Sequence, residues 1–160
     1  MTLHPGLQAV AGLLGTWRGE GSGEYPTIKS FSYTEELTFT DVGKPFLHYQ
    51  QRTWSPAGAP MHTETGFLRV IDSQTIEFVL AQPTGQTELA QGALNLTDAG
   101  FICKLDSQVV NSASAKQVQT TRRQLELSAD QLSTSFAMAA VGVPLTHHLA
   151  SVLHRLSTTS

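Results

Sequence analysis

A strict alternation of apolar and polar side chains is the feature that most limits how this chain can fold. It is clearest over residues 31–40, where Phe31, Tyr33, Glu35, Leu37 and Phe39 alternate with serine, threonine and glutamate. A period of two places successive side chains on opposite faces of a strand. Turn signals, such as Asp-Val-Gly-Lys-Pro at 41–45 and Pro-Thr-Gly at 83–85, recur about every 8–12 residues, which is typical of an all-β antiparallel meander.

The same alternation predicts strands along most of the chain. After residues 31–40 we expect strands over 46–53, 61–71, 75–80, 86–96, 100–109, 118–127 and 132–141. On the first of these, Leu47, Tyr49 and Gln51 share one face, and Phe46 and His48 lie on the other. No repeat or break in composition divides the sequence, so we expect a single domain over residues 1–160, a length that suits one core.

The first 23 residues predict a short helix followed by a glycine-rich strand. Apolar residues recur at helical spacing over residues 5–14, namely at Leu7, Val10, Ala11 and Leu14. Pro5 near the start and Gly15 after the end are the usual helix boundaries, so we expect a helical plug. In residues 15–23, glycine at every second position leaves one strand face nearly bare, which lets another group approach the backbone closely. We expect Trp17 to fill the core there.

Residues 138–155 hold three of the six histidines, His147, His148 and His154, and they allow two interpretations. The spacing of Leu145, Leu149, Val152 and Leu156 fits an amphipathic helix. The alternative is a closing strand with Thr146, His148, Ala150 and Val152 on one face and His147 on the other. We choose the strand, because so many strands in a small domain favour a closed barrel, and closure needs a last strand to pair with residues 15–23.

The predicted fold is therefore an antiparallel β-barrel, like those of lipocalins and fatty-acid-binding proteins, with a short N-terminal helix. A barrel of this size has room for a ligand. The net charge of −3 argues against nucleic acid or an anionic membrane as the main partner. No apolar run is long enough to span a bilayer, and the first residues make a poor signal peptide. Cys103 is the single cysteine, which fits a reducing cytoplasm.

The residues argue against a hydrolase and against a zinc site, and they leave a haem site as one of several open interpretations. Neither a Gly-x-Ser-x-Gly elbow nor a His-Glu-x-x-His motif is present in the sequence. Neighbouring histidines on a strand point to opposite faces, so His147 and His148 are poorly placed to bind one zinc ion. A single inward histidine can still be the axial ligand of a haem, which needs one imidazole and a large apolar cavity. The alternative is that His148 is a hydrogen-bonded interior group without a ligand role, or that both histidines are exposed.

Six motifs, in order along the chain, resemble the nitrobindin family of haem-binding β-barrels, which are also described as peroxynitrite isomerases. They are Gly-Thr-Trp-Arg-Gly-Glu-Gly at 15–21, Tyr-Pro-Thr at 25–27, Phe-Ser-Tyr-Thr-Glu-Glu at 31–36, Met-His-Thr-Glu-Thr-Gly-Phe at 61–67, Ala-Gln-Pro-Thr-Gly at 81–85, and the ending with Met138-Ala139 and His148-Leu149. The resemblance runs over residues 15–155, and its departures lie in loops such as 55–60.

The resemblance implies a ten-stranded barrel with one haem b per chain and a set of site residues. By position, His148 rather than His147 would be the axial ligand of the iron, and Thr27 would lie at the haem edge. We add Lys116, because a lysine near a propionate would offset its charge. The resemblance also places a group of residues on the pocket wall without contact to iron, namely Met61, His62, Gln82 and Met138.

The function that the resemblance implies is that of a ferric haem enzyme that isomerises peroxynitrite to nitrate and could also bind nitric oxide. We expect these small molecules, rather than nucleic acid or a membrane, as its partners; two copies could pair through a barrel face as a homodimer. The alternative is a non-catalytic carrier of a fatty acid or another small apolar ligand. An inward arginine would hold the carboxylate of such a ligand, and the candidates are Arg52, Arg69, Arg122 and Arg123.

Overall fold

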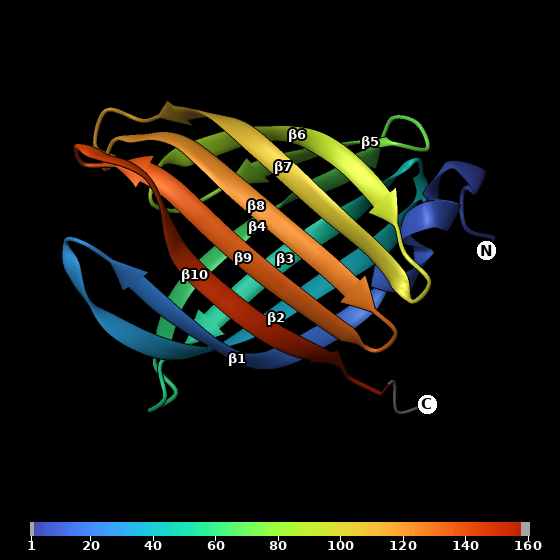
Figure 1. Ribbon diagram of the computed structural model, residues 1–160, viewed down its shortest axis with the longest axis horizontal. Coiled ribbons are helices and arrows are strands. Elements are labelled where there is room, and N and C mark those ends of the chain that lie inside the picture. The colour runs from blue at the N-terminus through green and yellow to red at the C-terminus, as the bar shows by residue number, and fades with distance from the viewer. Residues whose placement is uncertain (1, 158–160) are drawn as a thin grey trace.

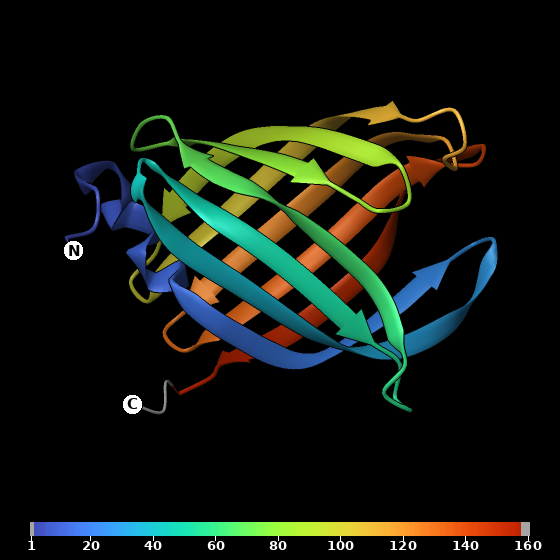
Figure 2. The ribbon, with the colours of Figure 1, turned by 180° about the vertical axis from the view of Figure 1, so that it is seen from behind.

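Ten antiparallel strands close into a barrel in the computed structural model, which describes residues 2–157. Each strand pairs with its neighbours in sequence, and β1 pairs with β10 to complete the ring (Figures 1 and 2). The elements are η1 (Pro5–Leu13), β1 (Gly15–Tyr25), β2 (Ile28–Lys44), β3 (Phe46–Trp54), β4 (Pro60–Val70), β5 (Thr75–Ala81), β6 (Gln86–Leu96), β7 (Gly100–Asn111), β8 (Val118–Ser128), β9 (Gln131–Ala140) and β10 (Val143–Arg155).

This architecture confirms the predicted all-β barrel with a short N-terminal helix. Some local details differ from the prediction. The helix is of the 3₁₀ type. The turn expected at 41–45 is largely strand, because β2 continues to Lys44 through a register shift between Asp41 and Lys44. Gly43 has a positive φ of 75° and donates its N–H to Asp41 Oδ1, which lets the hairpin turn sharply at Pro45. Of the expected domain, residue 1 and residues 158–160 lie outside the described part.

The last segment is a strand, as barrel closure required. It pairs with β1 from Trp17 opposite Arg155 to Gly23 opposite Leu149, and with β9 on its other side. Both edges of β10 therefore have ladder partners, which an amphipathic helix at this position could not supply.

One end of the barrel is filled by buried side chains, and the other, open end holds a cavity. Helix η1 lies at the filled end (Figures 1 and 2). Helix η1 covers the filled end with Leu7, Val10 and Leu13, all fully buried. Trp17 is also fully buried, as predicted, and its indole Nε1 donates to the Leu13 carbonyl at 2.8 Å. The guanidinium of Arg155 lies 4.2 Å from the Trp17 ring centroid and donates to the backbone of η1, which attaches the helix to the barrel.

The bare glycine face of β1 makes room for aromatic rings inside the barrel. A side chain at Gly21 would collide with the Tyr33 ring, and one at Gly23 with the Phe31 ring. Beyond Tyr33, the β1–β2 hairpin extends past the end of β3, because pairing of β2 with β3 begins only at Thr34 (Figure 1). The hairpin therefore projects from the open end, opposite η1. Among residues 2–157, no helix is long and apolar enough to cross a membrane.

Candidate functional site

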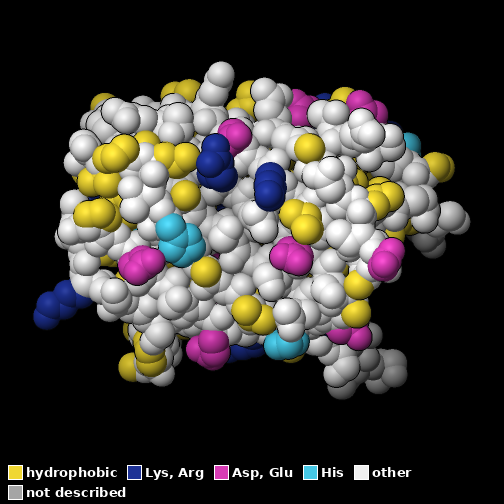
Figure 3. Space-filling view, viewed as in Figure 1, with side chains coloured by type: hydrophobic (Ala, Val, Ile, Leu, Met, Phe, Trp, Pro, Cys, Tyr) yellow, Lys and Arg dark blue, Asp and Glu magenta, His cyan; other side chains and the backbone are white. Residues whose placement is uncertain are grey.

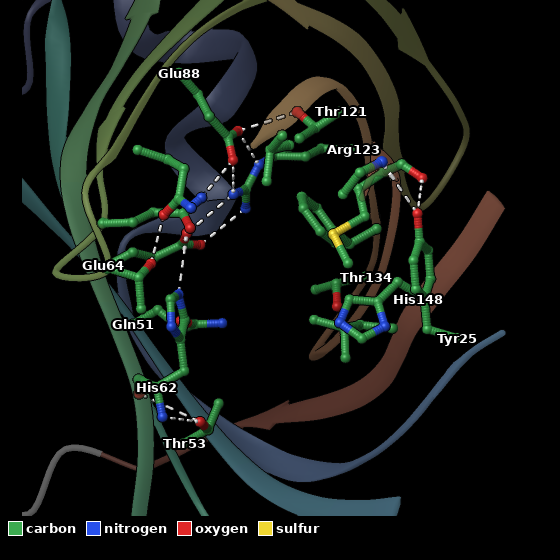
Figure 4. Close-up of a pocket in the computed structure, with 18 of the residues that line it drawn as sticks. Tyr25, Gln51, Thr53, His62, Glu64, Glu88, Thr121, Arg123, Thr134 and His148 are labelled. Atoms are coloured by element: carbon green, nitrogen blue, oxygen red, sulfur yellow. Dashed lines mark hydrogen bonds and ion pairs between the residues drawn. The ribbon is translucent and has the colours of Figure 1, made fainter. Parts of the chain in front are cut away.

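A cavity of about 620 Å³ fills the open half of the barrel. Its mouth is formed by the turns that hold Thr27, Ser114, Lys116 and Val141, and its floor includes Leu37 and Phe78. The wall is mostly apolar and aromatic, with convergent polar groups from several strands (Figure 4). A cavity of this size and character is typical of small-molecule and cofactor sites.

All the site residues proposed from the sequence lie around this one cavity, although they come from distant parts of the chain. These are Thr27, Met61, His62, Gln82, Lys116, Met138 and His148. Lys116 and Thr27 are exposed at the mouth, whereas His62, Gln82, Met138 and His148 are half-buried. Lys116 also anchors the β7–β8 loop, since its carbonyl accepts a hydrogen bond from Gln86 Nε2 at 2.9 Å.

A β-bulge turns His148 toward the cavity. On β10, His147 lies opposite Ala137 and Leu149 lies opposite Phe136, so His148 is the extra residue between two consecutive partners on β9. His148 and Leu149 both line the cavity, and His147 is exposed.

This bulge corrects the predicted strand pattern. Strict alternation put His148 on the same face as Val152, but the Val152 side chain is on the outside and 46% exposed. The two histidines lie on opposite faces, and the inserted residue makes His148, rather than His147, the one that faces inward.

The His148 imidazole has a defined tautomer and neighbours. Its Nδ1 lies 2.9 Å from the Glu24 carbonyl oxygen, which can only accept, so Nδ1 carries the proton and Nε2 keeps its lone pair. Burial lowers the pKa of His148, and the effect outweighs the hydrogen bond to Glu24, so the ring is neutral at neutral pH. The rings of Tyr25, Phe31 and Phe136 surround it, with centroids 5.2, 6.2 and 6.2 Å away.

A buried ionic cluster lies across the cavity from His148 (Figure 4). Arg123 donates to both oxygens of Glu64 at 2.8 and 2.9 Å, and to both oxygens of Glu88 at 2.9 Å. Burial alone would raise the pKa of Glu64, but Arg123 and then His62 outweigh it and hold that pKa well below its ordinary value. The same two carboxylates raise the pKa of Arg123 against the effect of burial.

A second buried polar group lies around Glu35. Gln51 Nε2 and the Ser151 hydroxyl donate to its two carboxyl oxygens at 2.8 and 2.7 Å. Burial raises the pKa of Glu35 despite these bonds, which favours the protonated acid. Gln51 is 6% exposed, and among residues 2–157 its Oε1 is the one buried side-chain nitrogen or oxygen that lacks a hydrogen-bond partner.

These polar groups were not among the site residues predicted from the sequence. A signal was present for Glu35, which occupies the apolar face of its strand between Tyr33 and Leu37. Glu64 and Glu88 gave no such signal, because their partner Arg123 lies 59 and 35 residues further along the chain.

The arginines proposed for a fatty-acid carrier are all paired with carboxylates. Arg52, Arg69 and Arg122 lie on the outer surface, in ion pairs with Glu36, Glu77 and Asp106. Arg123 does point inward, but its guanidinium already forms ion pairs with Glu64 and Glu88. A fatty-acid carboxylate would therefore meet a guanidinium that is already neutralised by two carboxylates, which disfavours a fatty-acid carrier.

A closed β-barrel presents the neutral imidazole of His148 to a large, mostly apolar cavity, which is the arrangement that a haem-binding barrel requires. Residues 6–155 match the family model described as "THAP4-like, heme-binding beta-barrel domain". The chain belongs to this family, as the nitrobindin-like motifs predicted.

Relatives with similar sequence and structure cover nearly the whole chain. It is 48% identical to the "Peroxynitrite isomerase" of Nocardia farcinica over 157 residues, which are 97% of this chain and 94% of that protein. It is 49% identical to "Peroxynitrite isomerase 1" of Mycolicibacterium paratuberculosis, with 96% of each chain covered. The crystal structure of Rv2717c from M. tuberculosis is similar with a TM-score of 0.95 and 45% identity, covering 98% of this chain and 100% of that one.

Proposed function

We propose that the chain binds one ferric haem b through His148 Nε2 and isomerises peroxynitrite to nitrate. The observation that carries the proposal is the His148 imidazole, which lines the cavity with Nδ1 bonded to the Glu24 carbonyl and Nε2 free to bind a metal. The names of the relatives from Nocardia farcinica and Mycolicibacterium paratuberculosis support the reaction.

The residues around the cavity fit a haem. His148 supplies a neutral nitrogen ligand, and Tyr25, Phe31 and Phe136 hold its ring in place. At the mouth, the exposed ammonium of Lys116 can pair with a propionate, and Thr27 can donate a hydrogen bond at the haem edge. Met61, His62, Gln82 and Met138 shape the wall.

The chain contributes ligation, orientation and a shaped cavity; when bound, ferric haem would supply the redox chemistry that rearranges peroxynitrite. The Glu24 carbonyl maintains the tautomer of His148, and burial keeps the ring unprotonated. Nitric oxide is a second small ligand for the same site. A cytoplasmic location and a homodimer stay predictions, although the free and buried Cys103 supports a reducing compartment.

Absorption spectra of the purified protein supplied with haem test the ligand assignment. We expect a ferric Soret band at one haem per chain, which His148→Leu largely abolishes. His147→Leu is the matched control, because the neighbouring side chain is exposed and should leave the band nearly intact. Equal spectra for the two variants would contradict the assignment of His148.

Protection of free tyrosine from nitration by peroxynitrite tests the reaction. The haem-loaded protein should protect tyrosine and yield nitrate, and the apo-protein should not. Equal protection by both forms would contradict haem-dependent catalysis, whereas the proposal that the protein binds haem would still stand.

A further inference from the structure

The interior of the barrel contains more negative than positive charge. The side chains of Glu64 and Glu88 are 2% and 0% exposed, and that of Arg123 is 13% exposed. Charges of both signs are scattered over the outer face in Figure 3, where water screens them. Inside the barrel such screening is weak, so the balance of charge within the cluster has consequences for what the cavity binds.

Both carboxylates of the cluster are ionised. Each of their four oxygens accepts an N–H from the guanidinium of Arg123, at 2.8 to 2.9 Å. A guanidinium can only donate, so an acid proton on Glu64 or Glu88 would displace one of these bonds. Further donors reinforce the arrangement: Tyr49 donates to Glu64 at 2.9 Å, and Gln82 and Thr121 donate to Glu88 at 2.5 and 3.2 Å.

One guanidinium therefore balances two carboxylates, which leaves one negative charge in the cavity wall. His62 Nε2 is 3.7 Å from Glu64 Oε2, so its half-buried ring would offset this charge only if it were protonated. Lys116 is exposed at the mouth. A buried charge without a counter-charge is costly, so the cavity should favour a ligand with positive charge at its centre.

We propose that the Glu64–Arg123–Glu88 cluster selects the ferric state of the bound haem. The core of a ferric porphyrin carries one positive charge, whereas that of a ferrous or metal-free porphyrin carries none. This inference rests on the proposed haem site and extends it, because it assigns to three residues that do not bind iron a role in setting its oxidation state. It also explains why the inward Arg123 would not attract a fatty-acid carboxylate.

The midpoint potential of the haem-loaded protein tests this proposal. Glu88→Gln keeps the shape of the side chain and removes the excess charge. At a fixed potential we expect it to raise the ferrous-to-ferric ratio about tenfold, which is an upward shift of about 59 mV for one electron. Glu126→Gln is the matched control: Glu126 is exposed on β8, the strand that carries Arg123, and its removal should leave the potential unchanged. Equal potentials for Glu88→Gln and the wild type would overturn the proposal.

A second pair of variants separates charge from folding. Gln82→Lys would place an ammonium beside Glu88 and should raise the potential in the same direction, with both carboxylates retained. Gln82→Met removes the same amide without adding charge, and a shift as large as that of Gln82→Lys would overturn the proposal. These two variants also decide the question if Glu88→Gln does not fold.

Porphyrin binding to the apo-protein tests the proposal without reducing the haem iron. The preference for ferric over metal-free protoporphyrin should fall about tenfold in Glu88→Gln and stay unchanged in Glu126→Gln. A wild type without any Soret band would overturn the proposed function and this inference together. A normal Soret band with equal potentials and equal preferences in all variants would overturn only the inference.

Discussion

Tyr25 is the residue that connects the β1–β2 hairpin to the site. Its hydroxyl donates to the Met138 carbonyl at 2.9 Å and accepts from the Ala140 N–H at 3.2 Å, while its ring packs edge-on against His148. Since the β1–β10 ladder ends at Gly23, these bonds attach the tip of β1 to β9 where β-pairing has stopped. The Tyr25 side chain thus stabilises the mouth of the cavity and orients His148, the proposed axial ligand of the haem.

We expect Tyr25→Phe to lower the free energy of unfolding by about 1–3 kcal/mol, because it leaves the buried Ala140 N–H without a partner. The ring remains, so the Soret band should persist. Urea unfolding measures the loss. Tyr33→Phe is the control, since the Tyr33 hydroxyl makes only a long contact of 3.5 Å with Ala150, and its effect should be smaller. A larger loss in Tyr33→Phe would contradict this account.

At the scale of the element, the bulge in β10 decides which histidine faces inward. A bulge adds one residue to a strand, and the side chains on either side of it no longer alternate in step. Leu153 and Ser151 point inward in regular alternation, and continued alternation would bring His147 inward; the extra residue makes His148 take that direction instead.

Deletion of His147 should therefore remove haem binding although His148 is still present. The shortened β10 can pair regularly with β9, and His148 then takes the outward place opposite Ala137. We expect the Soret band to fall as it does in His148→Leu, while the far-ultraviolet circular dichroism still shows a β-barrel. His147→Ala keeps the bulge and should keep the band. A deletion variant that binds haem like the wild type would show that the bulge does not orient the ligand.

For the whole molecule, the interior carboxylates link stability to pH. Burial alone would raise the pKa of Glu64, but Arg123 holds it below the ordinary value of 4.5. As the pH falls below 4.5, Glu64 takes up its proton more readily in the unfolded chain than in the folded one. Ionised Glu64 therefore stabilises the fold above pH 4.5, and this stabilisation is lost as the pH falls. For Glu35 the raised pKa gives the opposite sign, and its contribution is lost as the pH rises through that pKa.

We expect the unfolding free energy of the wild type to fall more steeply than that of Glu64→Gln as the pH drops from neutral through 4.5. Urea unfolding at a series of pH values measures both slopes. Glu35→Gln should not flatten the acid limb, because its linkage has the other sign. Parallel acid limbs for the wild type and Glu64→Gln would show that Glu64 is not the linked group.

The strands, the closure of the barrel and the burial of Trp17 could be predicted from the amino-acid sequence, because alternation and turn residues act over a few positions. Its motifs also pointed to the residues that gather around the cavity. The tertiary structure alone decided two features of the site. The inward direction of His148 depends on the pairing register of β10 with β9, and a single inserted residue reverses it. The Glu64–Arg123–Glu88 cluster joins β4, β6 and β8 across the barrel, and local alternation shows which face a side chain takes but not which charge lies opposite.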